Sequence, residues 1–316
     1  MKTAAVCIAT YQRPAGLMRL LRAITAQTRP SGWDIEVRVV NNSPAKGIRA
    51  WEDAVTEACP IAVVAIESRR NIACARNTAI EMGPADAFVF IDDDEVPTDG
   101  WLDSLLRRLC DADAVFGPVI GCAPRSTASW LVKSGAFDKP GPDHDGQIPW
   151  TQTRTSSTAV RGEWFGRSDS WFDPDYGISG GSDVEFFRRI AARGARFVHE
   201  RKAAVFEDIE PDRANWRAVL RRRYRAGAVL GRMERETSTA LRHIQLVKRA
   251  AAGACIAAAG VLSALAGNPG VLFQGICKIG VGIGAWRGHN PDYRVSRYPA
   301  KSSTNVKEAI PCVSPS

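Results

Sequence analysis

The sequence predicts an α/β fold with a mostly parallel sheet flanked by helices, followed by a helical appendage near the C-terminal end. Short apolar runs alternate with helical patterns over about the first 120 residues, and polar clusters follow three of the runs. Further along, a basic block leads into a long uncharged stretch. A hydrophobic content of 45% and a charged content of 24% are those of a globular protein, and 316 residues allow one large domain with an appendage.

The elements of the predicted sheet follow one another in a regular order. Apolar runs predict strands at 4–9, 35–40, 61–66, 87–91 and 114–119. Helical patterns lie between them, at 17–24 after Pro14, at 73–82 and at 101–109. Strands that alternate with helices of this length favour a parallel sheet covered on both faces, and such sheets bind ligands at the carboxyl ends of their strands.

Polar clusters lie at three of these strand ends, at 10–13, 41–43 and 92–94. The last belongs to a run of four consecutive carboxylates, 92–95. Two like charges about 4 Å apart repel by roughly 4 kcal/mol at an effective dielectric of 20, so the run needs a cation or an exposed position. A solvated turn, helped by Pro97 and Gly100, is the alternative to a site.

The stretch 122–172 is irregular, and we expect a long connection with short edge strands and an acceptor-binding loop. Regular structure returns after Gly180 and Gly181. Ser182 and Glu185 have the spacing of a capping box that opens an amphipathic helix. That interpretation leaves Asp183 unexplained, because its side chain would project outward from the first helical turn.

The C-terminal third carries the positive charge of the chain. Between Arg217 and Arg249 ten Lys and Arg face two Glu, which accounts for the whole net charge of +8. Residues 250–267 contain no charge, and a second apolar run reaches Trp286. This order favours an anionic membrane surface over nucleic acid as the partner. A buried helical hairpin, a monotopic or re-entrant membrane element and transmembrane helices all remain open.

Eight scattered cysteines without a C-x-x-C pair indicate a reduced, cytosolic environment rather than a disulfide framework. The N-terminal apolar run is too short for a signal peptide. The segment after Tyr293 is polar, and we expect it to be disordered.

Five motifs in sequence order resemble glycosyltransferase family 2, which has the GT-A fold. They are Ala-Thr-Tyr-Gln-Arg-Pro (9–14), Val-Val-Asn-Asn-Ser (39–43), Asn-Ile-Ala-Cys-Ala-Arg-Asn (71–77), Phe-Ile-Asp-Asp-Asp-Glu (90–95) and Gly-Gly-Ser-Asp-Val-Glu-Phe (180–186). The nearest resemblance is to bacterial enzymes that build exopolysaccharide or cell-surface glycans. It covers about 1–230, followed by a membrane-associating region at 231–290 and a polar tail at 291–316. The expected location is therefore the cytoplasmic face of the bacterial inner membrane, peripheral or inserted through the C-terminal region.

The resemblance assigns roles to individual residues. It implies nucleotide-sugar binding by Thr10, Tyr11, Arg13, Asn42, Arg76, Asp92 and Asp93, metal binding by Asp94, and proton abstraction by Asp183. Asn42 stands where relatives have an Asp that contacts uracil, which leaves the choice of UDP open. An exposed helix cation is the alternative for Arg76, and Glu185 is the alternative base. Relatives usually have a His after a later strand as a third metal ligand; the corresponding segment here offers Glu207 instead, with His199 earlier, and neither is assigned as a ligand.

The implied activity is a metal-dependent, inverting transfer. Mg²⁺ or Mn²⁺ at Asp94 would bridge the diphosphate of a nucleotide-sugar, expected to be a UDP-sugar. Asp183 would take the proton of the acceptor hydroxyl, on a glycan or a lipid-linked oligosaccharide. The Arg222–Arg225 stretch would contact phosphate groups or face the membrane. The alternatives are a nucleotidyltransferase acting on sugar phosphates and a non-catalytic membrane-binding module.

Overall fold

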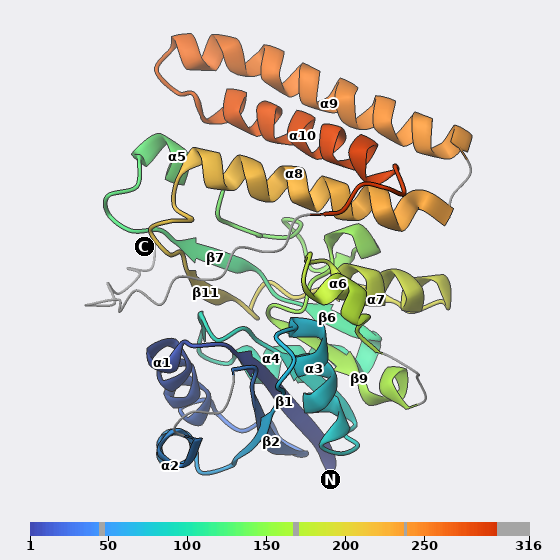
Figure 1. Ribbon diagram of the computed structural model, residues 1–316. Helices are drawn as coiled ribbons and strands as arrows, with labels where there is room; N and C mark the ends of the chain where they lie inside the picture. The colour runs from blue at the N-terminus through green and yellow to red at the C-terminus, as the bar shows by residue number, and fades with distance from the viewer. Residues whose placement is uncertain (44–47, 167–170, 237–238, 296–316) are drawn as a thin grey trace.

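The computed structural model describes residues 1–43, 48–166, 171–236 and 239–295. It has the predicted α/β architecture, with three long helices stacked on one side (Figure 1). The strands are β1 (Lys2–Thr10), β2 (Trp33–Asn41), β3 (Ala62–Ile66), β4 (Ala87–Phe90), β5 (Glu95–Pro97), β6 (Ala114–Phe116), β7 (Val119–Cys122), β8 (Gly146–Gln147), β9 (Thr158–Arg161), β10 (Phe197–His199) and β11 (Val205–Asp208). The α-helices are α1 (Pro14–Thr25), α2 (Ile48–Ala58), α3 (Ile72–Glu81), α4 (Trp101–Arg108), α5 (Ser129–Lys133), α6 (Pro174–Gly177), α7 (Ser182–Ala192), α8 (Trp216–Met233), α9 (Thr239–Leu265) and α10 (Gly270–Gly288).

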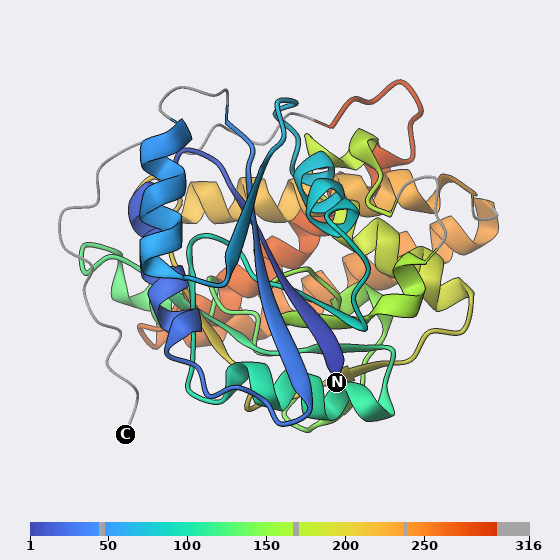
Figure 2. The ribbon, with the colours of Figure 1, turned by 90° about the horizontal axis from the view of Figure 1, so that it is seen from below.

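The large sheet has the strand order β3-β2-β1-β4-β9-β6-β10-β8, and its first four strands are parallel. Side chains alternate along β1, so that Ala4, Val6 and Ile8 pack with α1 on one face. Ala5 and Cys7 pack with α3 on the other. This confirms the predicted mostly parallel sheet covered on both faces, and Figure 2 shows helices on both sides of β1 and β2.

A second sheet of three strands, β5-β11-β7, lies between the large sheet and the helical stack (Figure 1). The single strand predicted at 114–119 is in fact two, because Gly117 and Pro118 lead the chain from β6 into β7. A Cβ on Gly117 would stand 1.7 Å from the carbonyl oxygen of Ala203, so only glycine permits this crossing. In the small sheet Glu207 of β11 pairs with Glu95 of β5.

Two expectations about the middle of the chain are wrong. The stretch 122–172 does not supply only edge strands, because β9 lies inside the large sheet, antiparallel to both β4 and β6. The capping box at Ser182 does not form either. Gly181 is the N-cap of α7 with a φ of 97°, and no side chain caps the helix. Glu185 instead bonds Arg189 one turn on, at 2.8 Å.

The three long helices are stacked in the order α8, α10, α9, with α9 outermost (Figure 1). Glycines allow the close packing. A Cβ on Gly231 of α8 would stand 2.1 Å from the carbonyl oxygen of Ala285 in α10, and one on Gly260 of α9 would stand 2.3 Å from the nitrogen of Leu272. Of the helices described, α9 alone is long and apolar enough to cross a membrane. Only 11% of its apolar 18-residue segment is buried inside the protein.

The sequence predicted no disulfide framework. Among the described residues six cysteines are free thiols: Cys7, Cys59, Cys74, Cys110, Cys255 and Cys277. Cys122 is disulfide-bonded, which that expectation did not include. Of the predicted polar tail, residues 291–295 follow α10 directly, and the part from 296 onward lies outside the described residues.

Candidate active site

The carboxyl ends of β1, β2 and β4 meet at one edge of the large sheet. Thr10 is opposite Asn41, and Cys7 is opposite Phe90, so the chain continues from β1 and β4 side by side. The first loop after β1 (10–13) and the acid turn after β4 (92–95) therefore lie against each other, as the sequence predicted.

Asp93 joins the acid turn to the first loop. Its carboxylate is 3% exposed and accepts hydrogen bonds from the Thr10 hydroxyl at 2.9 Å and the Tyr11 backbone N–H at 3.4 Å. Arg13 donates to the other oxygen at 3.4 Å. Asp93 thus holds three of the predicted nucleotide-binding residues in place.

Arginines neutralise the rest of the acid turn. Arg13 pairs with both Asp94 and Glu210, and Arg213 lies 3.6 Å from the same Asp94 oxygen. Although burial lowers the pKa of Arg13, the carboxylates around it raise that pKa by more. Arg76 lies 3.2 Å from Asp92. Asp92, Asp93 and Asp94 therefore tolerate one another through arginine counter-charges that belong to the protein.

Arg76 is not an exposed helix cation, because its side chain is 11% exposed and its guanidinium lies 5.9 Å from the centre of the Phe172 ring. The α3 helix that carries it is fixed at its N-terminus by Asn71, whose side chain accepts from the N–H groups of Ala73 and Cys74. The capping residue and Arg76 both belong to the motif at 71–77.

Glu95 and Glu207 form a second, deeper layer of the site. Glu95 is 1% exposed and accepts hydrogen bonds from the Asp92 backbone N–H at 3.0 Å and from Ser156. Burial raises the pKa of Glu95 well above its ordinary value. The pKa of Glu207 is lowered, because Lys139 at 2.7 Å and Arg213 at 3.2 Å outweigh the effect of its burial.

Asn42 has a different environment from the other predicted nucleotide contacts. It is 5% exposed, and its amide donates to the carbonyl oxygens of Glu67 at 2.9 Å and Arg69 at 2.5 Å. Its oxygen accepts from the Asn71 backbone N–H at 3.0 Å. These three bonds hold the segment that leads into α3, so Asn42 orders the loop beside the site.

Asp183 lies in the first turn of α7 and is partly exposed. Burial lowers the pKa of Arg154 to about 10, and the carboxylates of Glu95, Asp183 and Glu207 act on it in the opposite direction. The carboxylate of Asp183 thus acts electrostatically on the same arginine, Arg154, as Glu95 and Glu207 of the deeper layer do. Among the described residues no hydrogen bond or ion pair engages the Asp183 carboxylate, whereas Glu185 is 5% exposed and bound to Arg189.

The donor chemistry of the acid turn fits a hard divalent cation. Asp92 and Asp94 present carboxylates from one turn, which is the ligand type that Mg²⁺ combines with water and phosphate oxygens. The described residues contain no group of three or more His, Cys, Asp or Glu that could hold a metal on its own. The two candidates for a third ligand differ. Glu207 is ion-paired with Lys139 and Arg213, whereas the ring nitrogens of the buried His199 have no hydrogen-bond partner among the described residues, and its ring packs against Gly141.

Sequence motifs did not identify several residues of this site. Lys139, Arg154, Glu210 and Arg213 come from irregular segments far along the chain from the acid turn. The one available signal was the acidic cluster 207–210, which follows an apolar run as the acid turn does.

The chain belongs to glycosyltransferase family 2, since the family model "Glycosyl transferase family 2" matches residues 5–165, just over half of its length. It is therefore a glycosyltransferase with the GT-A fold, as the resemblance implied. The family sets aside the nucleotidyltransferase and the non-catalytic module.

Known relatives agree with this family, and solved structures agree with the fold. The chain is 29% identical over 262 residues to the succinoglycan biosynthesis protein ExoM of Rhizobium meliloti, covering 80% of this chain and 82% of ExoM. It is 26% identical to a pre-mycofactocin glycosyltransferase of Mycobacterium tuberculosis, over 71% of this chain and 46% of that protein. The crystal structure of S. aureus TarS 1-349 with UDP-GlcNAc has a TM-score of 0.54 at 14% identity, covering 76% of this chain and 68% of that one. The complex of the same fragment with UDP gives 0.52 at 15% identity and 92% and 90% coverage.

Proposed function

We propose that this chain transfers a sugar from a UDP-sugar to a glycan or lipid-linked acceptor in polysaccharide biosynthesis, with inversion at the anomeric carbon. The named role of ExoM in succinoglycan biosynthesis supports the pathway class, and the UDP-GlcNAc and UDP complexes of TarS support the donor class. The observation that carries the mechanism is the contrast between the carboxylate of Asp183 and those of the acid turn. The carboxylates of the acid turn are bonded or ion-paired, whereas that of Asp183 is partly exposed and uncommitted among the described residues.

The diphosphate of the donor would bind beside the acid turn. Arg13, Arg76 and Arg213 bring three guanidinium groups to this place, and their planar forks suit phosphate oxygens. Asp94, with Asp92, would hold Mg²⁺ or Mn²⁺, which when bound offsets the charge of the leaving UDP. Asp94 is paired with Arg13. We therefore infer that Asp94 releases Arg13 when donor and metal bind, so that Arg13 can contact a phosphate oxygen.

Asp183 would act as the general base. Its carboxylate takes the proton of the acceptor hydroxyl while the hydroxyl oxygen attacks the anomeric carbon. The bond from that carbon to the diphosphate oxygen breaks in the same step, so UDP leaves from the opposite face and the configuration inverts. Glu185 is a weaker candidate because Arg189 holds its carboxylate at 2.8 and 3.0 Å.

We further propose that residues 1–230 form the catalytic domain and that 231–290 associate with the cytoplasmic face of the bacterial inner membrane. α10 packs on α8 along its length, so the α9–α10 hairpin lies along the catalytic domain (Figure 1). Apolar side chains of α9, such as those of Leu262 and Leu265, are exposed. This arrangement favours a monotopic element, in which α9 lies in the membrane surface.

Release of UDP is the direct test. The purified full chain would be incubated with a panel of UDP-sugars and Mn²⁺, with water or a glycan fragment as acceptor, and UDP and the product anomer would be followed by NMR. We expect turnover of one UDP-sugar and inversion at its anomeric carbon. Absence of turnover and of thermal stabilisation by every nucleotide-sugar, with and without metal, would overturn the donor class.

A further inference from the structure

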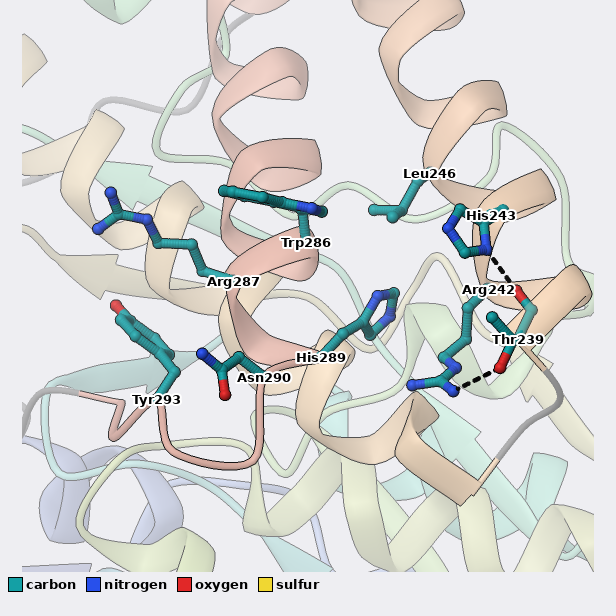
Figure 3. Close-up of a pocket in the computed structure, with 9 residues that line it drawn as sticks. All are labelled: Thr239, Arg242, His243, Leu246, Trp286, Arg287, His289, Asn290 and Tyr293. Carbon is teal, nitrogen blue, oxygen red and sulfur yellow. Dashed lines mark hydrogen bonds between the residues drawn. The ribbon is translucent and has the colours of Figure 1, made fainter.

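A cavity of about 560 Å³ lies between the start of α9 and the end of α10, separate from the acid turn (Figure 3). Arg242, His243 and Leu246 line it from α9, and Trp286 and Arg287 line it from α10. His289 follows α10 and lies between the two groups (Figure 3). This volume is within the usual range for small-molecule sites, and the glycosyl transfer described above does not use it.

The charge of the cavity is positive. Two arginines and two histidines belong to its lining, and no described lining residue is an Asp or Glu. The carboxylate of Glu234 is already satisfied by Arg249 at 3.0 Å and by His289 at 3.1 Å. Arg242 donates to the Thr239 hydroxyl at 3.0 Å, while its buried Nε has no partner among the described residues. An anion is therefore the ligand that this lining favours.

The cavity also has an apolar and aromatic side. Leu246 projects from α9 and the indole of Trp286, 63% exposed, from α10 (Figure 3). The neighbouring Val247 is 67% exposed, and Leu262 and Leu265 further along α9 are 73% and 81% exposed. Trp beside cations at the end of an apolar helix is typical of the membrane–water interface.

We propose that this cavity binds the phosphate headgroup of an anionic membrane lipid. Arg242 and Arg287 would contact the phosphate, and Leu246 and Trp286 would contact the glycerol and the upper part of the acyl chains. The exposed apolar side of α9 would continue into the bilayer beside the bound lipid. The site would fix the position of the hairpin on the membrane, whereas the basic block outside it would act only through unspecific attraction.

The test compares two double variants of the full chain in co-sedimentation with phosphatidylcholine vesicles that contain phosphatidylglycerol. Arg242→Gln with Arg287→Gln removes two cavity cations, and Arg217→Gln with Arg221→Gln removes two exposed cations that belong to the basic block and lie outside the cavity. We expect the first pair to weaken partitioning about 30-fold, about 2 kcal/mol at 1.4 kcal/mol per tenfold. The control pair should lose only a few fold, because α10 separates α8 from the membrane-facing α9 and unspecific attraction falls off within a Debye length. Equal losses would overturn the site, and circular dichroism confirms that both variants fold.

Two further measurements distinguish a lipid from a soluble phosphate. Inorganic phosphate and glycerol 3-phosphate should neither raise the melting temperature as much as the vesicles do nor release the protein from them. If either one does so at millimolar concentration, the ligand is a soluble phosphate and the lipid assignment is wrong. Trp286→Ala should weaken vesicle binding about tenfold, because the indole contributes only to the lipid part of the site. An unchanged partition coefficient for Trp286→Ala would also contradict the proposal.

Discussion

Arg13 pairs with Asp94, so that the first loop of the sheet edge supplies the counter-charge of the acid turn. The two residues are separated by 81 positions in the sequence and follow the neighbouring parallel strands β1 and β4. The pair is mostly buried, with side-chain exposures of 11% and 9%, and Glu210 shares the same guanidinium. Removal of Arg13 would therefore take one counter-charge away from Asp93, Asp94 and Glu210 at once.

Arg13→Gln should lower the free energy of unfolding by about 3–5 kcal/mol, the usual cost of breaking a buried pair. Mn²⁺ should recover more of this loss in the variant than it adds to the wild type, because the ion replaces the missing charge. Urea titrations with and without Mn²⁺ measure both effects. The matched control is Arg19→Gln, whose partner Asp208 is 44% exposed, and which should cost less than about 1 kcal/mol. A loss no larger than that of the control would show that the pair is not important for stability.

Asp183→Asn should reduce the rate of sugar transfer by about 10²–10⁴-fold, the usual contribution of a general base. Its stability should stay within about 0.5 kcal/mol of the wild type, because no described hydrogen bond or ion pair is lost. Steady-state UDP release and thermal melting give the two values. Asp53→Asn, at an exposed carboxylate in α2, should change neither the rate nor the stability.

Glu185→Gln provides the contrast to Asp183. It should destabilise the protein by roughly 1–3 kcal/mol, because a buried carboxylate bonded to Arg189 is replaced by a weaker partner. The transfer rate of the folded fraction should fall much less than in Asp183→Asn. If Glu185→Gln is the less active of the two, the roles of the two acids are reversed.

Glu95 and Glu207 are opposite each other on neighbouring strands, and their contributions to folding stability should depend on pH in opposite directions. The folded pKa of Glu95 is raised by burial, so its contribution to stability is complete below the unfolded value of about 4.3 and is lost as the pH rises through the folded value. The folded pKa of Glu207 is lowered, so its contribution is present above about 4.3 and is lost as the pH falls.

Unfolding free energies measured over a pH series test this directly. Relative to the wild type, Glu95→Gln should gain stability as the pH rises, because the amide cannot ionise in its buried position. Relative to the wild type, Glu207→Gln should lose stability as the pH rises from acid, because the amide lacks the negative charge that pairs with Lys139 and Arg213. Parallel profiles for the two variants would contradict the assigned directions.

The contact of α10 with α8 depends on glycine. A Cβ on Gly284 would stand 2.0 Å from the carbonyl oxygen of Tyr224, so Gly284→Ala should cost about 1–3 kcal/mol through overpacking. Gly282→Ala is the matched control on the same helix, since the nearest atom would be Arg249 Cβ at 3.8 Å. It should leave stability unchanged or raise it by up to about 1 kcal/mol. Melting temperatures of the two alanine variants are sufficient to compare them.

The sequence predicted the elements whose signal is local. β1 and β4 contain continuous apolar runs, β2 alternates apolar with charged residues before Val39 and Val40, and three leucines mark the buried face of α1. Each of these elements could therefore be recognised alone. The short strand β9 could not, because four residues between Ser-rich and Gly-rich segments carry little pattern and its central place depends on β4 and β6. The capping box failed because Gly181 adopts a positive φ, which the Ser182 spacing does not reveal.

The candidate site likewise contains residues that could be predicted from local motifs and residues that could not. Thr10, Arg13, Arg76 and the acid turn belong to motifs at strand and helix ends, where the topology of a parallel sheet brings them together. The partners of the acids could not be predicted. Lys139, Glu210 and Arg213 reach the site from irregular segments, and their pairing depends on how the small sheet lies on the large one.

The order of the layers has a consequence for how an acceptor would arrive. The acid turn leads into the small sheet, and this sheet lies between the large sheet and the stack of α8, α10 and α9 (Figure 1). A protein attached through α9 would therefore hold its catalytic edge on the side nearest the lipid. An acceptor anchored in the same leaflet would then find the enzyme by diffusion in two dimensions, without leaving the bilayer.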